Sequence, residues 1–156
     1  MVHCNKSLRP AIVCLTILSI SLFACDINLE LPERPAPVSA ATGFEVFANQ
    51  EWQDTGVKIR PGKTLTILYI SGLWSPWAGG NYDGIGSGGD PKCSCNVVAG
   101  VSHAALIGKI GDSNPFLVGN SFKQTMGEAG DLFLGINDSR LGDNSGSLKV
   151  EIIFGP

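Results

Sequence analysis

Short apolar runs separated by glycine-rich turns recur in this 156-residue chain from about residue 43 onward, and no segment keeps a sustained helical period. The turn Arg60-Pro61-Gly62-Lys63 has proline at the second position, where its fixed φ favours a β-turn. Strands this short, joined by turns this frequent, predict an all-β fold, specifically an antiparallel β-sandwich. The candidate strands are Phe44–Ala48, Gln53–Ile59, Thr64–Ser71, Ala104–Ile110, Phe116–Gly119, Asp131–Ile136 and Ser147–Phe154.

The first 24 residues have the pattern of a secretory signal. Lys6 and Arg9 precede an apolar stretch at 11–24, which is shorter than the roughly 20 apolar residues that a membrane span needs. The stretch ends in Leu22-Phe23-Ala24-Cys25, which resembles the lipobox of bacterial lipoproteins. This resemblance implies cleavage before Cys25 and attachment of lipid to its thiol. The alternative is an ordinary cleaved signal in which the cysteine is incidental.

Residues 25–42 are predicted to form an extended tether, because Pro32, Pro35 and Pro37 lie among small and charged residues without periodicity. The folded domain is then residues 43–156, a common size for a single domain. With lipid on Cys25, the expected location is the bacterial cell envelope. The chain would be anchored to a membrane and face the periplasm or the cell surface.

The charge balance argues against a nucleic-acid partner. The full chain has a formal net charge of −3, with 11 basic and 14 acidic side chains. Removing the signal takes away Lys6 and Arg9 and leaves nine basic side chains against 14 acidic ones, a net charge of −5. A nucleic-acid-binding domain would instead present a basic patch.

Two cysteines, Cys93 and Cys95, remain in the predicted domain once the signal and Cys25 are set aside. In an exported protein this spacing favours a local disulfide or a free pair over a zinc site. Zinc usually takes four nitrogen or sulfur ligands, and His103 is the one histidine outside the signal. His103 precedes a candidate strand in an apolar setting and has no partner in a catalytic-triad arrangement. We interpret it as structural.

The loop at 135–147 concentrates oxygen-bearing side chains between two candidate strands. Asp138, Asp143 and Asn144 offer two carboxylates and an amide within seven residues. Gly142 and Gly146 would let the main chain turn so that carbonyl oxygens point inward. Ca²⁺ takes about 6 to 8 oxygens from such mixed sources. The same residue types are common in tight turns, so a hairpin without an ion is the alternative.

Five segments occur in the same order as in the PA-IL-like galactophilic lectins of bacteria, which the domain resembles along most of its length. The most specific element is the final one. The resemblance implies a galactose-binding-domain-like jelly roll that binds sugars through calcium and performs no catalysis, and a homo-oligomer is one assembly open to it. The matching segments are Phe44–Asn49, Pro61–Ile67, Gly72–Trp77, Ala105–Gly111, and Asn137-Asp138 followed by Asp143–Ser147.

The resemblance also implies roles for individual residues. In the family, adjacent sugar hydroxyls complete the coordination of the ion, so the partner is expected to be galactose or another sugar with vicinal hydroxyls. Residues 90–93 and the glycine-rich loop replace the family's sugar-contacting His and Gln, which leaves the sugar open. The expected Ca²⁺ ligands are the side chains of Asp138, Asp143 and Asn144, with main-chain oxygens from Trp77 and from Arg140 or Leu141. The expected carbohydrate-binding residues are Trp77, Asp90, Asp138, Ser139 and Asp143.

Two other functional classes compete with the lectin. In a structural or assembly lipoprotein, the calcium loop would only stabilise the fold. A glycosidase needs two acids flanking the scissile bond, whereas Asp138 and Asp143 share one tight loop. Trp74 and Trp77 are candidate sugar platforms, although a tryptophan at a strand end is more often part of the core. The glycine-rich stretch at 78–89 reads as a long surface loop, either for binding or as a simple crossing.

Overall fold

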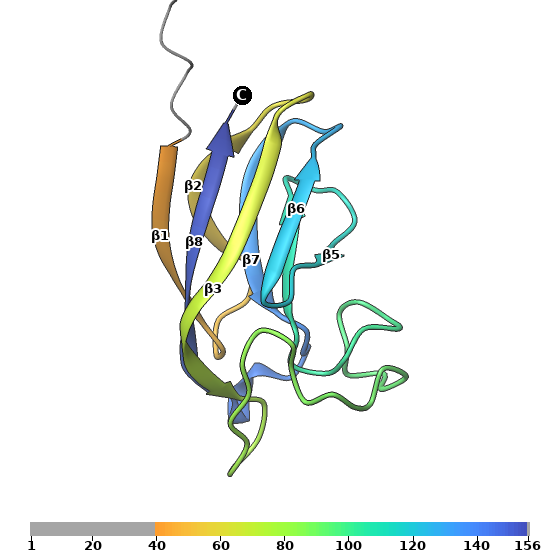
Figure 1. Ribbon diagram of the computed structural model, residues 1–156. Coiled ribbons are helices and arrows are strands. Elements are labelled where there is room, and N and C mark those ends of the chain that lie inside the picture. Colours follow the sequence, from red (N-terminus) through yellow and green to blue (C-terminus); the bar gives the residue numbers. More distant parts are fainter. Residues whose placement is uncertain (1–39, 156) are drawn as a thin grey trace, which may run out of the picture. The chain divides into compact units, whose positions relative to one another are not determined.

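The computed structural model describes residues 40–155, which form two four-stranded antiparallel sheets facing each other (Figure 1). One sheet has the strand order β1-β8-β3-β6 and the other has the order β2-β7-β4-β5. The predicted antiparallel β-sandwich is therefore confirmed. The strands are β1 (Ala40–Phe47), β2 (Gln53–Ile59), β3 (Thr64–Ser75), β4 (Leu106–Ile110), β5 (Phe116–Leu117), β6 (Ser121–Thr125), β7 (Gly130–Ile136) and β8 (Ser145–Gly155), with a short 3-10 helix η1 (Leu141–Asp143) before β8.

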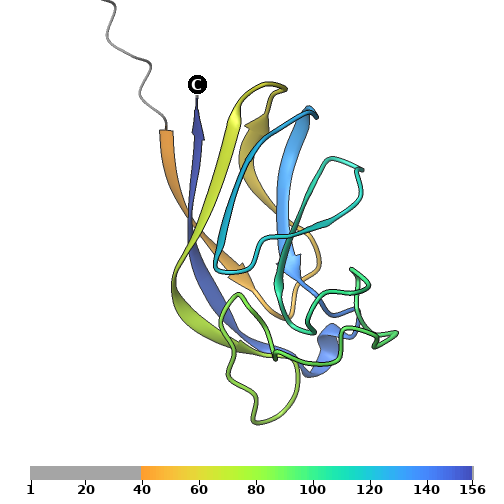
Figure 2. The same ribbon diagram turned by 45° about the vertical axis from the view of Figure 1, so that its right-hand side comes forward.

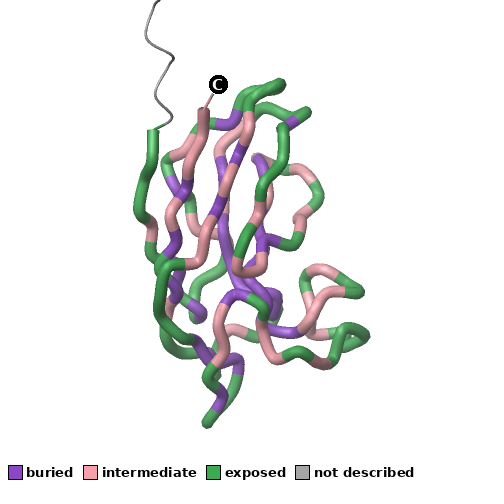
Figure 3. The backbone as a smooth tube through the Cα atoms, viewed as in Figure 1, coloured by how far each residue is buried: buried purple, intermediate pink, exposed green. Residues whose placement is uncertain are grey.

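Buried residues of the central strands form the core between the two sheets. Figure 3 marks the buried positions in purple along the backbone. In β3, Leu65 and Ile67 are fully buried while the threonines beside them are only partly buried, as expected for strands with one face inward. Leu132 and Leu134 of β7 face the same interior from the opposite sheet. Trp74 is also a core residue, because it is 1% exposed and its indole Nε1 donates to the carbonyl oxygen of Ala104 at 3.0 Å.

Several element boundaries differ from those expected from the sequence. β1 starts at Ala40 and pairs there with Phe154 of β8, so three residues assigned to the tether are part of a strand. β3 continues to Ser75, with a register shift against β8 between Tyr69 and Ser71. β6 was not expected, since Phe122 is its one apolar residue and the others are exposed. An edge strand of this kind pairs through its main chain and leaves almost no hydrophobic pattern.

The long segment between β3 and β4 lies at the same end of the sandwich as η1 (Figure 2). Within it, Tyr82 forms an isolated antiparallel bridge to Trp74, so part of the glycine-rich loop is fixed to the end of β3. Cys93 and Cys95 are joined by a disulfide, which resolves the choice left open by their spacing. Within residues 40–155, no helix has the length and apolarity needed to cross a membrane. The predicted signal and Cys25 lie outside the described residues.

Candidate functional site

Asn137 fixes the connection between β7 and η1 against the segment before β4. Its side chain is fully buried. Its Oδ1 accepts from the main-chain nitrogen of Val98 at 2.7 Å, and its Nδ2 donates to the carbonyl oxygens of Val98, Val101 and Ser102 at 3.0 to 3.3 Å. Because one buried side chain satisfies several groups of another segment, the two loops hold a defined position relative to each other.

Asp138 places a carboxylate in the interior of this end of the sandwich, where it is 4% exposed. Its Oδ1 accepts from the main-chain nitrogen of Arg140 at 2.8 Å, and its Oδ2 lies 3.8 Å from Nε2 of His103. One hydrogen bond and one distant imidazole leave much of its acceptor capacity unused. Buried carboxylates are normally paired with a cation or coordinate a metal, so this environment suits an ion ligand.

Asn144 follows η1 and is 7% exposed. Its Nδ2 donates to the carbonyl oxygen of Ala48 at 3.1 Å, whereas its Oδ1 is buried without a hydrogen-bond partner among the described residues. A buried acceptor without a donor costs about 1 to 3 kcal/mol, and a bound cation would remove that cost. The residues present therefore fit the hard, oxygen-coordinated ion predicted from the sequence.

The side chain of Asn120 provides a useful contrast, because its Oδ1 is also buried and unpartnered in the described part of the chain. This oxygen lies against main chain, since a Cβ built on Gly84 would be 2.8 Å from it. Its Nδ2 donates to the carboxylate of Asp83 at 3.0 Å. Asn144 differs in its place in the chain, because it lies six positions after Asp138 in the loop that contains η1, and this loop thus contains a second buried oxygen-bearing side chain.

The other predicted ligands occupy different surroundings. Asp143 is exposed in η1, so its carboxylate faces solvent.

Gly146 has a φ of +82°, and a Cβ there would lie 2.4 Å from the carbonyl oxygen of Leu73. This glycine is required for the turn from η1 into β8. Gly142 was expected to have a similar role, but it lies within η1 and has no positive φ.

Trp77 lies just beyond β3 and forms an aromatic cluster with two neighbours. Its ring stacks on the imidazole of His103 at a centroid distance of 5.5 Å and an interplanar angle of 2°. Tyr82 packs edge-on against it at 5.6 Å. The indole remains 36% exposed, so one part of the ring is available at the surface. The carbonyl oxygen of Trp77 accepts from Ser75 Oγ and from the nitrogen of Gly80.

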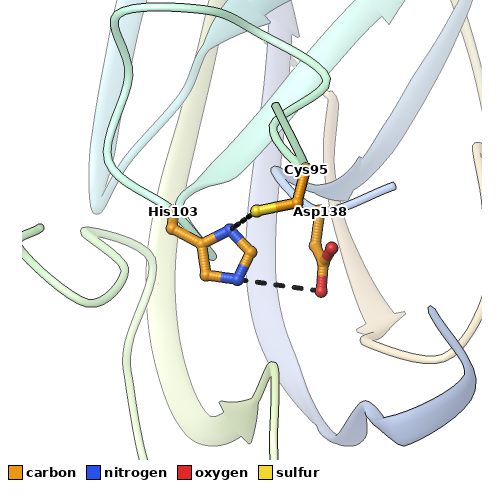
Figure 4. Close-up of side chains that lie close together, drawn as sticks. All are labelled: Cys95, His103 and Asp138. Atoms are coloured by element: carbon orange, nitrogen blue, oxygen red, sulfur yellow. Dashed lines mark hydrogen bonds and ion pairs between the residues drawn. The ribbon is translucent and has the colours of Figure 1, made fainter. Parts of the chain in front are cut away.

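His103 is the residue of this site that sequence reasoning missed. It is 5% exposed, and Trp77 stacks on one face of its ring. Asp138 lies at its Nε2 edge (Figure 4). No pattern in the sequence marks this position, because it depends on the pairing of Leu106 in β4 with Ile136 in β7. Residues just before β4 must therefore lie close to residues just after β7 in an antiparallel pair.

A recess of about 230 Å³ lies beside the loop that contains Asp138. Asp138, Ser139 and Leu141 form one side, and Val97 and Trp52 contribute apolar surface. Three residues predicted for the ion or the sugar thus meet at one recess, whose lining combines acceptors, a hydroxyl and apolar side chains. Such mixed linings are common in ligand sites.

Asp90 forms its hydrogen bonds within the turn around the disulfide and not with the residues that line the recess. It is exposed and has a φ of +52°. Its carbonyl oxygen accepts from the nitrogen of Cys93 at 3.0 Å and from Nδ2 of Asn96 at 2.8 Å. These contacts give Asp90 a role in the turn around the disulfide, and its predicted contact with a sugar stays a prediction.

Comparisons with known proteins agree with this architecture. A family model described as PA-IL-like protein matches residues 41–155. Comparison with curated proteins gave no match. Among solved structures, the N-terminal domain of EclA, described as a PllA-like lectin, has a similar fold, with a TM-score of 0.54, 22% identity and coverage of 72% of this chain and 94% of that chain. Since the family model spans nearly all of the described residues, the chain belongs to the PA-IL-like family of lectin-like carbohydrate-binding proteins.

Proposed function

We propose that this chain is a calcium-dependent carbohydrate-binding protein. The observation that carries the proposal is that one loop contains two buried side chains with unused oxygen acceptors, namely the carboxylate of Asp138 before η1 and Oδ1 of Asn144 after it. Asp143 and main-chain oxygens of Trp77 and of Arg140 or Leu141 would complete the protein's share of the shell. Bound Ca²⁺ would offer open coordination positions to adjacent sugar hydroxyls.

The surrounding residues would orient the sugar. Asp138 and Asp143 carry acceptors for the hydroxyl protons, and hydrogen bonds to carboxylates are stronger than those between neutral groups. Ser139 is exposed at the rim of the recess and can both donate and accept. The exposed part of Trp77 can pack against the apolar face of a sugar ring, since His103 and Tyr82 hold the indole from the protein side.

The sequence supports a membrane attachment for the same protein. We propose lipidation and a place in the bacterial cell envelope because the sequence begins with basic residues, continues with an apolar stretch and has Cys25 at the end of that stretch. Mass spectrometry of the N-terminal peptide should show an acylated Cys25 as the first residue. An unmodified peptide that begins elsewhere would remove the anchor from the proposal.

Calorimetry with galactose, its epimers and a sugar analogue lacking adjacent hydroxyls tests the main proposal. In calcium, at least one sugar with vicinal hydroxyls should bind weakly, because a small ligand gains at most about 1.5 kcal/mol per heavy atom and usually much less. A chelator should abolish the heat of binding. Asp138→Asn should abolish it as well, because the substitution keeps the volume and removes one charge.

Asp112→Asn is the matched control, because Asp112 is an exposed aspartate in the turn after β4. It should bind sugar and calcium as the wild type does. Sugar binding that persists in chelator would contradict calcium dependence. Calcium binding without affinity for any tested sugar would instead favour a structural lipoprotein in which the ion only stabilises the loop.

A further inference from the structure

The Cys93–Cys95 disulfide lies against a histidine that the proposed sugar site does not use as a ligand. Sγ of Cys95 is 3.5 Å from Nδ1 of His103, and this imidazole is 5% exposed (Figure 4). Ligand atoms of Cys95, His103 and Asp138 lie within 4.8 Å of one another. These residue types are the usual zinc ligands, and they come from three separate places in the sequence.

We propose that reduction of the Cys93–Cys95 disulfide creates a zinc site formed by the two thiolates and Nδ1 of His103. Around a tetrahedral Zn²⁺, bonds of about 2.3 Å to sulfur and about 2.05 Å to nitrogen place these two atoms about 3.6 Å apart. The observed separation of 3.5 Å between Sγ of Cys95 and Nδ1 of His103 matches this value. The side chains of Cys95 and His103 therefore already place one sulfur and one nitrogen at ligand spacing.

The second sulfur is held near the first by the local turn. The main-chain nitrogen of Cys95 donates to Sγ of Cys93 at 3.2 Å, a bond that would also stabilise a thiolate at that position. Two thiolates on one tetrahedral zinc lie roughly 3.7 Å apart, whereas a disulfide joins its sulfurs at about 2.05 Å and carries no thiolate. The disulfide and the zinc site are therefore mutually exclusive.

His103 is hydrogen-bonded at Nδ1 in the disulfide form, because this nitrogen lies 2.9 Å from Oδ1 of Asn96 and donates its proton to that amide oxygen. Zinc binding at Nδ1 requires Asn96 to release this hydrogen bond. On metal binding the proton would move to Nε2, which faces Oδ2 of Asp138 at 3.8 Å. A ligating histidine usually donates its other N–H to a carboxylate, which fixes the ring and strengthens the ligand.

The chemistry balances with a dithiol as the reductant. Two electrons and two protons pass from the dithiol to the Cys93–Cys95 sulfurs, the S–S bond breaks, and the reductant leaves as a disulfide. Zn²⁺ then displaces the two thiol protons to solvent. Cys93 is exposed and Cys95 partly exposed, so reductant and metal can reach the pair. Three protein ligands leave the fourth position to water, as in zinc sites with an open position.

Cobalt titration of the full chain tests the proposal, in a background where Cys4, Cys14 and Cys25 are serine and His3 is glutamine. After reduction and removal of the reductant without oxygen, one equivalent of Co²⁺ should bind. It should give the visible absorption of a tetrahedral thiolate complex, which Zn²⁺ should bleach. The oxidised protein should bind at least a hundredfold more weakly. Cys95→Ser and His103→Gln should each weaken binding at least tenfold, while Ser94→Ala should leave it unchanged.

Nitrogen NMR of the zinc-loaded imidazole separates this site from simple capture by a dithiol, and it does not depend on whether the His103 variant folds. The ligated nitrogen should be Nδ1, with the proton on Nε2. An imidazole that zinc leaves unperturbed would overturn the proposal. Equal affinity of the oxidised and reduced proteins for cobalt would do the same.

Discussion

The substitution Asn144→Ala separates a structural role of this residue from a role as a calcium ligand. In the calcium-free protein it removes the hydrogen bond from Nδ2 to the carbonyl oxygen of Ala48, a residue that is fully buried. Leaving that carbonyl without a donor costs about 1 to 3 kcal/mol. The substitution also removes the unpartnered Oδ1, which offsets part of the cost. We therefore expect the free energy of unfolding to fall by about 1 to 2 kcal/mol in chelator.

Calcium should enlarge the difference in unfolding free energy between the wild type and the Asn144→Ala variant. A ligand present at a hundred times its Kd stabilises the folded state by about 2.7 kcal/mol, and the wild type alone should gain this amount. The same substitution should then cost about 4 kcal/mol in calcium. For a domain of this size, the gain of the wild type corresponds to a rise in Tm of roughly 10 °C.

Urea denaturation of the wild type and the variant, each in calcium and in chelator, measures the four free energies. Asn120→Ala is the matched control, because Asn120 also combines an unpartnered Oδ1 with one hydrogen bond from Nδ2. The loss of unfolding free energy caused by Asn120→Ala should be the same in calcium and in chelator. If the cost of Asn144→Ala is likewise independent of calcium, Asn144 is not a ligand and its open oxygen needs another explanation.

Three further predictions concern the framework of the domain. Gly146→Ala should lower the free energy of unfolding by about 2 kcal/mol or more, because the left-handed conformation alone costs a residue with a Cβ about 1 to 2 kcal/mol and the new atom would meet a carbonyl oxygen of β3. A change below about 0.5 kcal/mol in urea denaturation would refute this. Trp74→Phe should cost about 1 to 3 kcal/mol in the same assay, since the carbonyl oxygen of Ala104 loses its buried donor; no loss would mean that water replaces the indole. The hydrogen bond to Asp131 raises the pKa of Lys58 above its ordinary value. The pair therefore stabilises the fold below the ordinary pKa, and its contribution is lost as pH rises through the raised one. Lys58→Met should remove this small alkaline dependence, which an unfolding series from pH 8 to 12 would detect.

The strands that the sequence predicts well are those whose pattern comes from burial. β2 has the bounds expected from the sequence, and the alternation in β3 marks the inward face correctly. β6 escaped prediction because an edge strand can consist of polar residues that hydrogen-bond through the main chain alone. Its pairing with β3 depends on main-chain hydrogen bonds in the sheet and cannot be inferred from the five side chains.

The candidate site could be proposed from the sequence where its residues are neighbours in the chain and not where the fold brings distant residues together. Asp138 and Asn144 could be proposed because one short loop contains both. His103 could not be placed, because its contact with Asp138 depends on the pairing of β4 with β7. Whether Cys93 and Cys95 are joined also required the structure, since both states are compatible with their spacing.

The direction of β8 determines which way the site faces. β8 begins at Ser145, next to Asn144, and its residue Phe154 pairs with Ala40, where β1 begins. Nine residue steps along the strand separate these two points, a distance of about 30 Å. The chain thus enters the domain at one pole and presents the η1 loop at the other (Figure 1). A partner bound at the η1 loop would therefore lie about 30 Å from the start of β1, so the two ends of the domain could be engaged independently.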